Sequence, residues 1–251
     1  KDGNKVTDFS DVGKLKGVGN VKFENNEELV TLIYVVKHLR SHGVFSLYLN
    51  MPYIPNGRMD RVKTSEDVFT LKYFAEVINW LKFDSVTVLD PHSSVSEALI
   101  DNIVVKHPYE YVWKAINSED IGGTDNLTMF FPDEGAMKRY SEMFGLPYTF
   151  GIKKRDWKTG RIEGLDVSGM TDLIKNKKIL IVDDISSRGG TFYHSAKKLK
   201  ELGASEIYLY ISHCENTILE GEIFNSGLIE RVFTTNSIFT KEHEKITVME
   251  V

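Results

Sequence analysis

The residues of this chain whose types and spacing could do chemistry are concentrated in Lys178–Thr191, which reads KILIVDDISSRGGT. An apolar, β-branched run typical of a buried parallel strand ends in two adjacent carboxylates, Asp183 and Asp184. A loop of small residues follows and leads into a helical pattern. Loop glycines let backbone N–H groups approach a ligand, and a helix N-terminus favours an anion. The segment predicts a phosphate site beside carboxylates that suit hydroxyl groups or a cation, a combination that a sugar phosphate offers.

A simpler interpretation is that the acidic pair caps the helix and that the glycines only form a turn. The complete string is more specific, because it resembles the phosphoribosyl-diphosphate (PRPP) binding motif of the type I phosphoribosyltransferase fold. The resemblance implies that Asp183 and Asp184 hold the ribose hydroxyls. It also implies that the 5-phosphate is held by the loop residues Ser186, Ser187, Arg188, Gly189, Gly190 and Thr191. Proteins with this motif include transferases that consume PRPP and synthetases that make it.

Composition limits the possible classes of protein. The 251 residues are 41% hydrophobic and 27% charged, which is typical of a globular protein with ample core. The net charge of −5 gives no basic footprint for a nucleic-acid partner. The single cysteine, Cys214, excludes an intramolecular disulfide and fits a cytoplasmic location. Because no run of 18 apolar residues occurs, no membrane association is expected.

Helical and strand patterns alternate along most of the chain. Helices are predicted at 25–42, 66–81, 134–144 and 191–202, and strands at 44–50, 85–90, 127–131, 148–153, 178–183 and 206–212. Such alternation indicates an α/β fold in which largely parallel sheets carry helices on both faces. The polar stretch 117–126 separates two such series, which predicts two halves, 1–118 and 119–251.

Charged residues follow two predicted strands of the first half, at the carboxyl ends where open α/β sheets bind ligands. Arg58 and Asp60 lie in a loop that contains proline and glycine, and Asp90 and His92 lie two residues apart after the next strand. Imidazole and carboxylate groups there could face a metal ion or a phosphate. Taken singly, each segment has a simpler explanation, a solvated turn or a structural histidine.

The second half repeats this placement. Asp133 follows a predicted strand and precedes a helix, so that it could bind a metal or simply cap the helix. Lys153 and Arg155 end the next strand and enter the loop 156–164, where they could be catalytic or merely solvated.

Together these segments resemble the motifs of the PRPP synthetase (ribose-phosphate diphosphokinase) family, in the same order along the chain. The helical segment around Lys72 and Ala75, LKYFAEVINWL, matches that family as well. The resemblance implies ATP binding by Arg58, Asp60 and His92, magnesium binding by His92 and Asp133, and catalysis by Lys153 and Arg155 on a mobile loop. It further implies two phosphoribosyltransferase-like halves, the first for ATP and Mg²⁺ and the second for ribose phosphate. A homo-oligomer, a dimer or a multiple of dimers, is expected.

Three departures from the family pattern stand out. Met59 replaces the family's glutamine, which removes an adenine-side contact. The family's N-terminal ATP-side segment, rich in aromatic and acidic residues, has no clear counterpart in 1–24. The phosphate loop has Ser187 and Arg188 where the synthetases have Asp-Thr.

The expected reaction moves the β,γ-diphosphate of Mg-ATP to the anomeric hydroxyl of ribose 5-phosphate, which yields PRPP and AMP. One alternative is the same chemistry on a larger acceptor such as ADP-ribose, whose second phosphate would suit Arg188. Others are a PRPP-consuming phosphoribosyltransferase and a non-catalytic regulatory homologue. The transferase has no need of the first-half motifs, and the regulator has no need of Lys153, Arg155 or His92.

Overall fold

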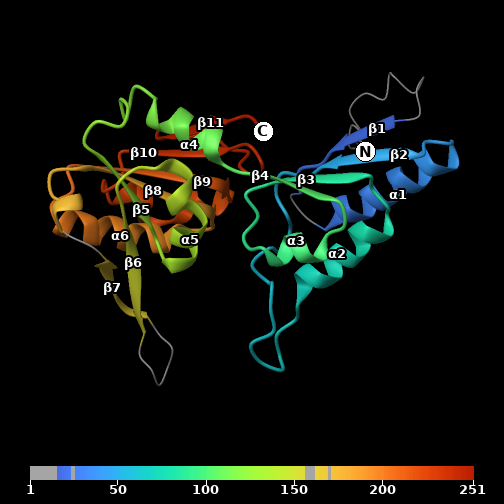
Figure 1. Ribbon diagram of the computed structural model, residues 1–251, viewed down its shortest axis with the longest axis horizontal. Helices are drawn as coiled ribbons and strands as arrows, with labels where there is room; N and C mark the ends of the chain where they lie inside the picture. The colour runs from blue at the N-terminus through green and yellow to red at the C-terminus, as the bar shows by residue number, and fades with distance from the viewer. Residues whose placement is uncertain (1–15, 24–25, 156–161, 169–170) are drawn as a thin grey trace. The chain divides into compact units, whose positions relative to one another are not determined.

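The computed structural model describes residues 16–23, 26–155, 162–168 and 171–251, and they form two compact units, Lys1–Lys106 and His107–Val251 (Figure 1). The helix Tyr109–Ile116 (α4) belongs to the second unit, because its Val112, Ala115 and Ile116 are buried against that unit's core. The boundary therefore lies at 106/107, twelve residues before the expected boundary at 118/119. No described helix is long and apolar enough to span a membrane.

The first unit is a four-stranded parallel sheet in the order β1-β2-β3-β4. Its elements are β1 (Lys16–Asn20), α1 (Glu27–Ser41), β2 (Ser46–Asn50), α2 (Thr70–Trp80), β3 (Ser85–Leu89), α3 (Val95–Leu99) and β4 (Ile103–Lys106). Strand β1 lies within a segment in which the sequence showed no pattern. It is paired along its whole length with β2, a tertiary contact that no local propensity encodes.

The helices of the first unit lie on one face of its sheet (Figure 1). Every crossover moves one strand further in the same direction, and right-handed crossovers of that kind place successive helices on the same side. Burial along β2 alternates accordingly, with Leu47 and Leu49 buried among helical side chains and Tyr48 partly exposed. Among the described residues of this unit, the predicted second layer of helices does not occur.

The second unit is a seven-stranded sheet in the order β11-β10-β9-β8-β5-β6-β7, in which only β7 is antiparallel to its neighbour. After α4 come β5 (Leu127–Phe131), α5 (Glu134–Phe144), β6 (Tyr148–Arg155), β7 (Ile162–Ser168), β8 (Lys178–Ser186), α6 (Gly190–Glu201), β9 (Glu206–Cys214), α7 (Glu222–Asn225), β10 (Arg231–Thr235) and β11 (Ile246–Met249). Short 3₁₀ turns, η2 (Thr171–Leu173) and η3 (Asn216–Glu220), precede β8 and α7.

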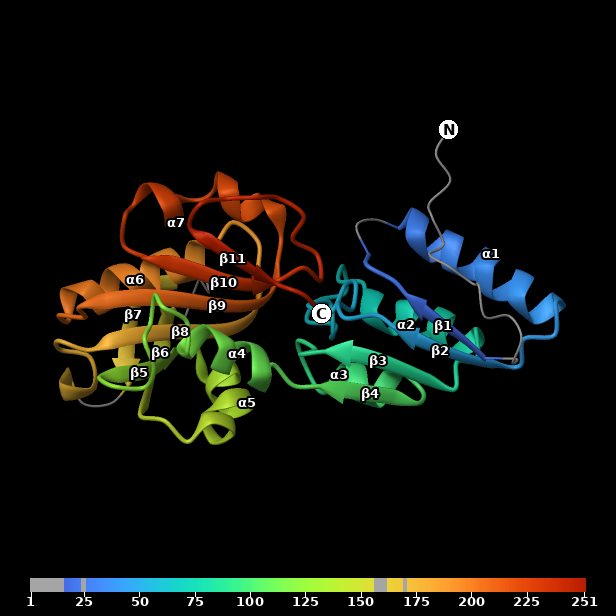
Figure 2. The same cartoon turned by 90° about the horizontal axis from the view of Figure 1, so that it is seen from above.

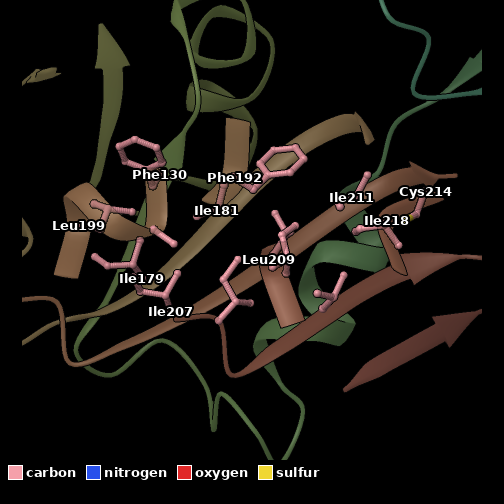
Figure 3. Close-up of a cluster of buried hydrophobic side chains, with 14 of the residues drawn as sticks. Phe130, Ile179, Ile181, Phe192, Leu199, Ile207, Leu209, Ile211, Cys214 and Ile218 are labelled. Atoms are coloured by element: carbon pink, nitrogen blue, oxygen red, sulfur yellow. The ribbon is translucent and has the colours of Figure 1, made fainter. Parts of the chain in front are cut away.

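Helices cover both faces of this second sheet, as the sequence predicts. Alternate residues of β8 and β9 pack with α6 and α7 in one cluster, which contains Ile179, Ile181 and Leu209 (Figure 3). The intervening residues, such as Leu180 and Val182, pack with α4 and α5, which lie on the other side of the strands from α7 (Figure 2). Burial of one such apolar side chain stabilises the folded state by roughly 1.5–3 kcal/mol relative to leaving it exposed. The two-sided core therefore makes β8 a rigid platform for the residues that follow it.

Strand order in the second unit reverses between β5 and β8. The chain moves outward from β5 to β6, and in the opposite direction from β8 to β9. The helices α5 and α6 consequently leave the sheet on opposite faces, and their N-termini flank a switch point. In open α/β sheets, ligands bind in the crevice at such a point, beyond the carboxyl ends of the strands.

Candidate functional site

The two polar segments of the first unit come together at the carboxyl ends of β2 and β3. The amide of Leu89 donates to the carbonyl oxygen of Pro52 at 2.9 Å, which ties the start of one loop to the end of the neighbouring strand. Further along this loop, the Cα of Gly57 faces His92, so that an added Cβ would lie 3.6 Å from the histidine's own Cβ. The two segments are therefore neighbours in the first unit.

Asp60 is buried within this loop. Its two carboxylate oxygens accept from Nε and Nη2 of Arg61 at 2.7 and 3.0 Å, and the residue is only 4% exposed. The hydrogen bond from Arg61 lowers the pKa of Asp60, and Ser93 and His92 lower it further. Asp60 therefore lies close to the residues that follow β3. The proposed ATP contact Arg58 lies two residues away with its side chain exposed.

Asp90, at the end of β3, has a backbone conformation that non-glycine residues rarely adopt. Its φ is +40°, and its amide donates to the carbonyl oxygen of Lys106 at 2.9 Å. Only 4% of Asp90 is exposed. Such strain persists where surrounding packing enforces it, and it is concentrated at functional sites. Here it redirects the chain so that Pro91 and His92 follow the strand end, where His92 is half-buried.

In the second unit, Asp133 caps α5. Its Oδ1 accepts from the amide of Ala136 at 3.1 Å, in the extended conformation of an N-cap residue. This is the simpler of the two predicted roles. It also fixes the carboxylate at the carboxyl end of β5, beside β8.

Lys153 and Arg155 lie on β6, which continues two residues beyond its predicted end. The strand forms an antiparallel hairpin with β7, with Lys153 opposite Leu165 and Arg155 opposite Ile162. A register shift between Lys154 and Arg155 marks a bulge near the tip. The sequence did not predict β7. Residues 156–161 of the predicted mobile loop lie outside the described residues, and so do the side chains of both cations.

The acidic pair lies at the carboxyl end of β8 and is bound by a residue that the sequence reading missed. Nη2 of Arg139, on α5, lies 2.5 Å from Oδ1 of Asp184 and 3.4 Å from Oδ1 of Asp183. The side chain of Asp184 is 2% exposed and that of Asp183 is 18% exposed. Burial and the neighbouring Asp184 carboxylate raise the pKa of Asp183 well above its usual range, although Arg139 opposes this shift.

The loop after the acidic pair is held from behind by η3 and α7. Ser187 Oγ lies 3.1 Å from Oγ1 of Thr217, which donates to Oε2 of Glu215 at 3.1 Å. The carbonyl oxygen of Arg188 lies so close to Gly221 that a Cβ on this glycine would be 1.9 Å away. The loop conformation is therefore set by the protein itself before any ligand binds.

Arg188, the cation that sets this loop apart from the family pattern, is paired within the protein. Its Nη2 donates to Oε2 of Glu220 at 3.0 Å, and both side chains are mostly exposed, at 73% and 59%. The loop then reaches Gly189, which has a φ of +74° and leads into α6 at Gly190.

The predicted residues thus form two groups, one in each unit. The sequence reading missed Arg139, Glu215, Thr217 and Gly221, because none belongs to a recognised motif. One feature of the sequence could have indicated Arg139. It is a basic residue on the helix that follows β5, and β5 pairs with β8, the strand that carries the acidic pair. Pairing of β5 with β8 could not be read from the sequence, since 46 residues separate the end of one strand from the start of the other.

No family model matches the chain. It is 29% identical over 219 residues to a ribose-phosphate pyrophosphokinase of Thermococcus kodakarensis, covering 86% of this chain and 72% of that protein. It is 29% identical over 237 residues to a ribose-phosphate pyrophosphokinase of Pyrococcus abyssi, covering 90% and 76%. The crystal structure of phosphoribosylpyrophosphate synthetase from Mycobacterium smegmatis has the same fold, with a TM-score of 0.76 at 17% identity over 94% of this chain and 77% of that one. Over most of its length the chain is therefore similar to ribose-phosphate pyrophosphokinases, and it has the fold of a phosphoribosylpyrophosphate synthetase.

Proposed function

We propose that this chain transfers the β,γ-diphosphate of Mg-ATP to the anomeric hydroxyl of ribose 5-phosphate, which yields PRPP and AMP. The observation that carries the proposal is the acidic pair followed by a preset glycine loop and a helix N-terminus, at the switch point of the second sheet. The ribose-phosphate pyrophosphokinases of Thermococcus kodakarensis and Pyrococcus abyssi, which the chain resembles over most of its length, support the same reaction.

The second unit would bind the acceptor. The carboxylates near the carboxyl end of β8 are suited to accept from the ribose hydroxyls, and Asp183 is the more exposed of the two. The N-terminus of α6 and the backbone N–H groups before it would bind the 5-phosphate. Because Ser187 is already held by Thr217, little ordering of this loop would accompany binding.

The first unit would bind the nucleotide. Arg58 is exposed in the loop that packs against His92, and we assign it to the phosphates of the nucleotide. Mg²⁺ commonly binds through one or two protein groups, phosphate oxygens and water. We assign His92 of the first unit and Asp133 of the second as the protein donors to Mg²⁺. When bound, Mg²⁺ supplies neutralisation of the polyphosphate charge.

In the reaction, the anomeric oxygen bonds to the β-phosphorus and releases its proton to solvent. The bond from that phosphorus to the oxygen that bridges to AMP breaks. Such transfers ask the protein mainly for alignment and for stabilisation of charge on the phosphoryl oxygens. We assign this stabilisation to Lys153 and Arg155, at the tip of the hairpin that β6 and β7 form.

Arg188 gives the ADP-ribose alternative no support, since its guanidinium is paired with Glu220. A phosphoribosyltransferase would use the second unit alone and would leave the buried loop and strained strand end of the first unit unexplained.

The deciding experiment incubates the protein with Mg-ATP and, separately, with ribose 5-phosphate or ADP-ribose, and identifies the products by mass. We expect AMP in equal amount with PRPP from ribose 5-phosphate. A parallel incubation with PRPP and nucleobases, without ATP, tests the transferase. Formation of a nucleotide there, or the absence of AMP from every mixture, would refute the proposal.

A further inference from the structure

The acidic pair of the second unit has an internal counter-ion. Arg139 reaches it from α5, with its Nη2 2.5 Å from Asp184 and 3.4 Å from Asp183. The arginine side chain is 26% exposed, so the interaction is shielded from bulk water on most sides. Shielding of this kind makes a charge pair much stronger than one on the surface.

Several contacts hold Arg139 in this position. Its neighbour Tyr140 is 1% exposed and packs in the core of the second unit, which fixes the rotation of α5. The guanidinium also lies over the ring of Tyr140, at 5.0 Å from its centroid. At the helix N-terminus, the cap by Asp133 anchors α5 to the end of β5. The cation is therefore carried by a rigid helix.

The two carboxylates of the pair differ in their environments. The side chain of Asp184, 2% exposed, makes the shorter contact with the guanidinium. That of Asp183 is 18% exposed, and its Oδ1 accepts from the amide of Asp184 at 3.0 Å. One carboxylate is thus enclosed with its cation, and the other remains accessible to a ligand.

We propose that Arg139 is a positioning residue that serves as the resident cation of the acidic pair, enclosing Asp184 and leaving Asp183 to meet the acceptor. A guanidinium between two carboxylates occupies the place where a divalent cation would otherwise bind. Two cations that share this pair would repel each other at short range. The pair therefore binds hydroxyl groups in preference to a metal ion of its own. The part that concerns the acceptor rests on the proposed function, and the part that concerns the cation does not.

The first test measures Mn²⁺ binding without nucleotide, by calorimetry and by electron paramagnetic resonance, on the wild-type chain and on Arg139→Met. We expect the variant to gain a Mn²⁺ site roughly tenfold or more tighter than any at the wild-type pair, because the repelling charge is gone. Lys138→Met is the matched control. It removes one charge at the adjacent position, where Lys138 pairs with Glu134 at 2.7 Å and both side chains are about two-thirds exposed.

Arg139→Lys keeps the positive charge of the side chain but changes its shape. A retained positive charge should keep the pair closed to Mn²⁺, so this variant should bind as the wild type does. Adding Asp184→Asn to Arg139→Met should abolish the gained site. If Arg139→Met is poorly stable alone, its thermal midpoint should rise with Mn²⁺ while that of the wild type does not. Equal Mn²⁺ binding by the wild type, Arg139→Met and Lys138→Met would overturn the proposal.

The second test concerns the acceptor and uses steady-state kinetics. Asp183→Asn should raise the KM for ribose 5-phosphate more than Asp184→Asn does, since only the first changes the accessible carboxylate. The reverse order would overturn this assignment. If no acceptor is used by the wild type, the proposed function fails, while the Mn²⁺ result still decides the role of Arg139.

Discussion

Ile223 occupies the space that a side chain on Gly189 would need. A Cβ at Gly189 would lie 2.1 Å from Cδ1 of Ile223, and the glycine has a φ of +74°. Ile223, a fully buried residue of α7, thus packs against Gly189, the last loop residue before α6. The close approach makes the loop conformation depend on packing behind it.

Gly189→Ala is therefore expected to destabilise the protein strongly. The left-handed conformation costs an alanine about 1–2 kcal/mol, and the collision with Ile223 adds roughly 1–3 kcal/mol. Chemical denaturation measures the sum. Gly227→Ala is the matched control, because Gly227 has a φ of +65° with no atom within 4 Å of an added Cβ. Equal losses in the two variants would show that Ile223 does not constrain the loop.

Asp183→Asn is expected to raise the stability of the unliganded protein at neutral pH. The folded-state pKa of Asp183 lies above the unfolded value of about 3.9, because burial and Asp184 disfavour its charge. Its contribution is fully present below the unfolded pKa and is lost as pH rises through the folded pKa. Asparagine cannot ionise and avoids this loss.

Thermal midpoints between pH 4 and pH 8 test this expectation. The advantage of Asp183→Asn should grow as pH rises and vanish near pH 4. Asp125→Asn, in an exposed loop, controls for the substitution itself. A variant less stable than the wild type at pH 7 would mean that attraction to Arg139 outweighs burial and repulsion.

Lys153→Ala and Arg155→Ala should each lower kcat by about 10² to 10³ and leave the affinity for ATP nearly unchanged. In the proposed mechanism, the positive charges of these two residues act chiefly on the phosphoryl group while it is being transferred. Rapid-quench kinetics and equilibrium nucleotide binding separate the two effects. Lys154→Ala is the matched control, because Lys154 lies between the two residues and is assigned no role in transfer. Loss of ATP binding with normal turnover of the bound enzyme would reassign both residues to the nucleotide site.

The fold was largely predictable, because each regular segment carries its own periodicity. Strand β5 and helix α5 occur at their predicted bounds, and β8 extends three residues beyond its prediction. The apolar run in β8 is buried on both faces, which made it recognisable. The short edge strands β1 and β11 were not predicted, because they form strands only through pairing with β2 and β10.

The site was predictable only where a motif carried it. The acidic pair and its loop were identified by type and order. Arg139 and Thr217 act from other elements, and their contacts depend on strand order and on the packing of η3, neither of which is local. A further difference is Arg188, which the sequence suggests for a second phosphate and which the structure pairs with Glu220.

Arg188→Thr is expected to leave acceptor preference unchanged. The Arg188–Glu220 pair is exposed, so that its loss should cost at most about 1 kcal/mol of stability. The guanidinium is already neutralised there, and ribose 5-phosphate has no second phosphate to attract it. The measurement is the ratio of kcat/KM for ribose 5-phosphate to kcat/KM for ADP-ribose. Glu220→Gln, which frees Arg188 without removing it, is the matched variant. A selective loss of the ADP-ribose reaction in Arg188→Thr, with a selective gain in Glu220→Gln, would instead show that Arg188 leaves Glu220 to bind a second phosphate.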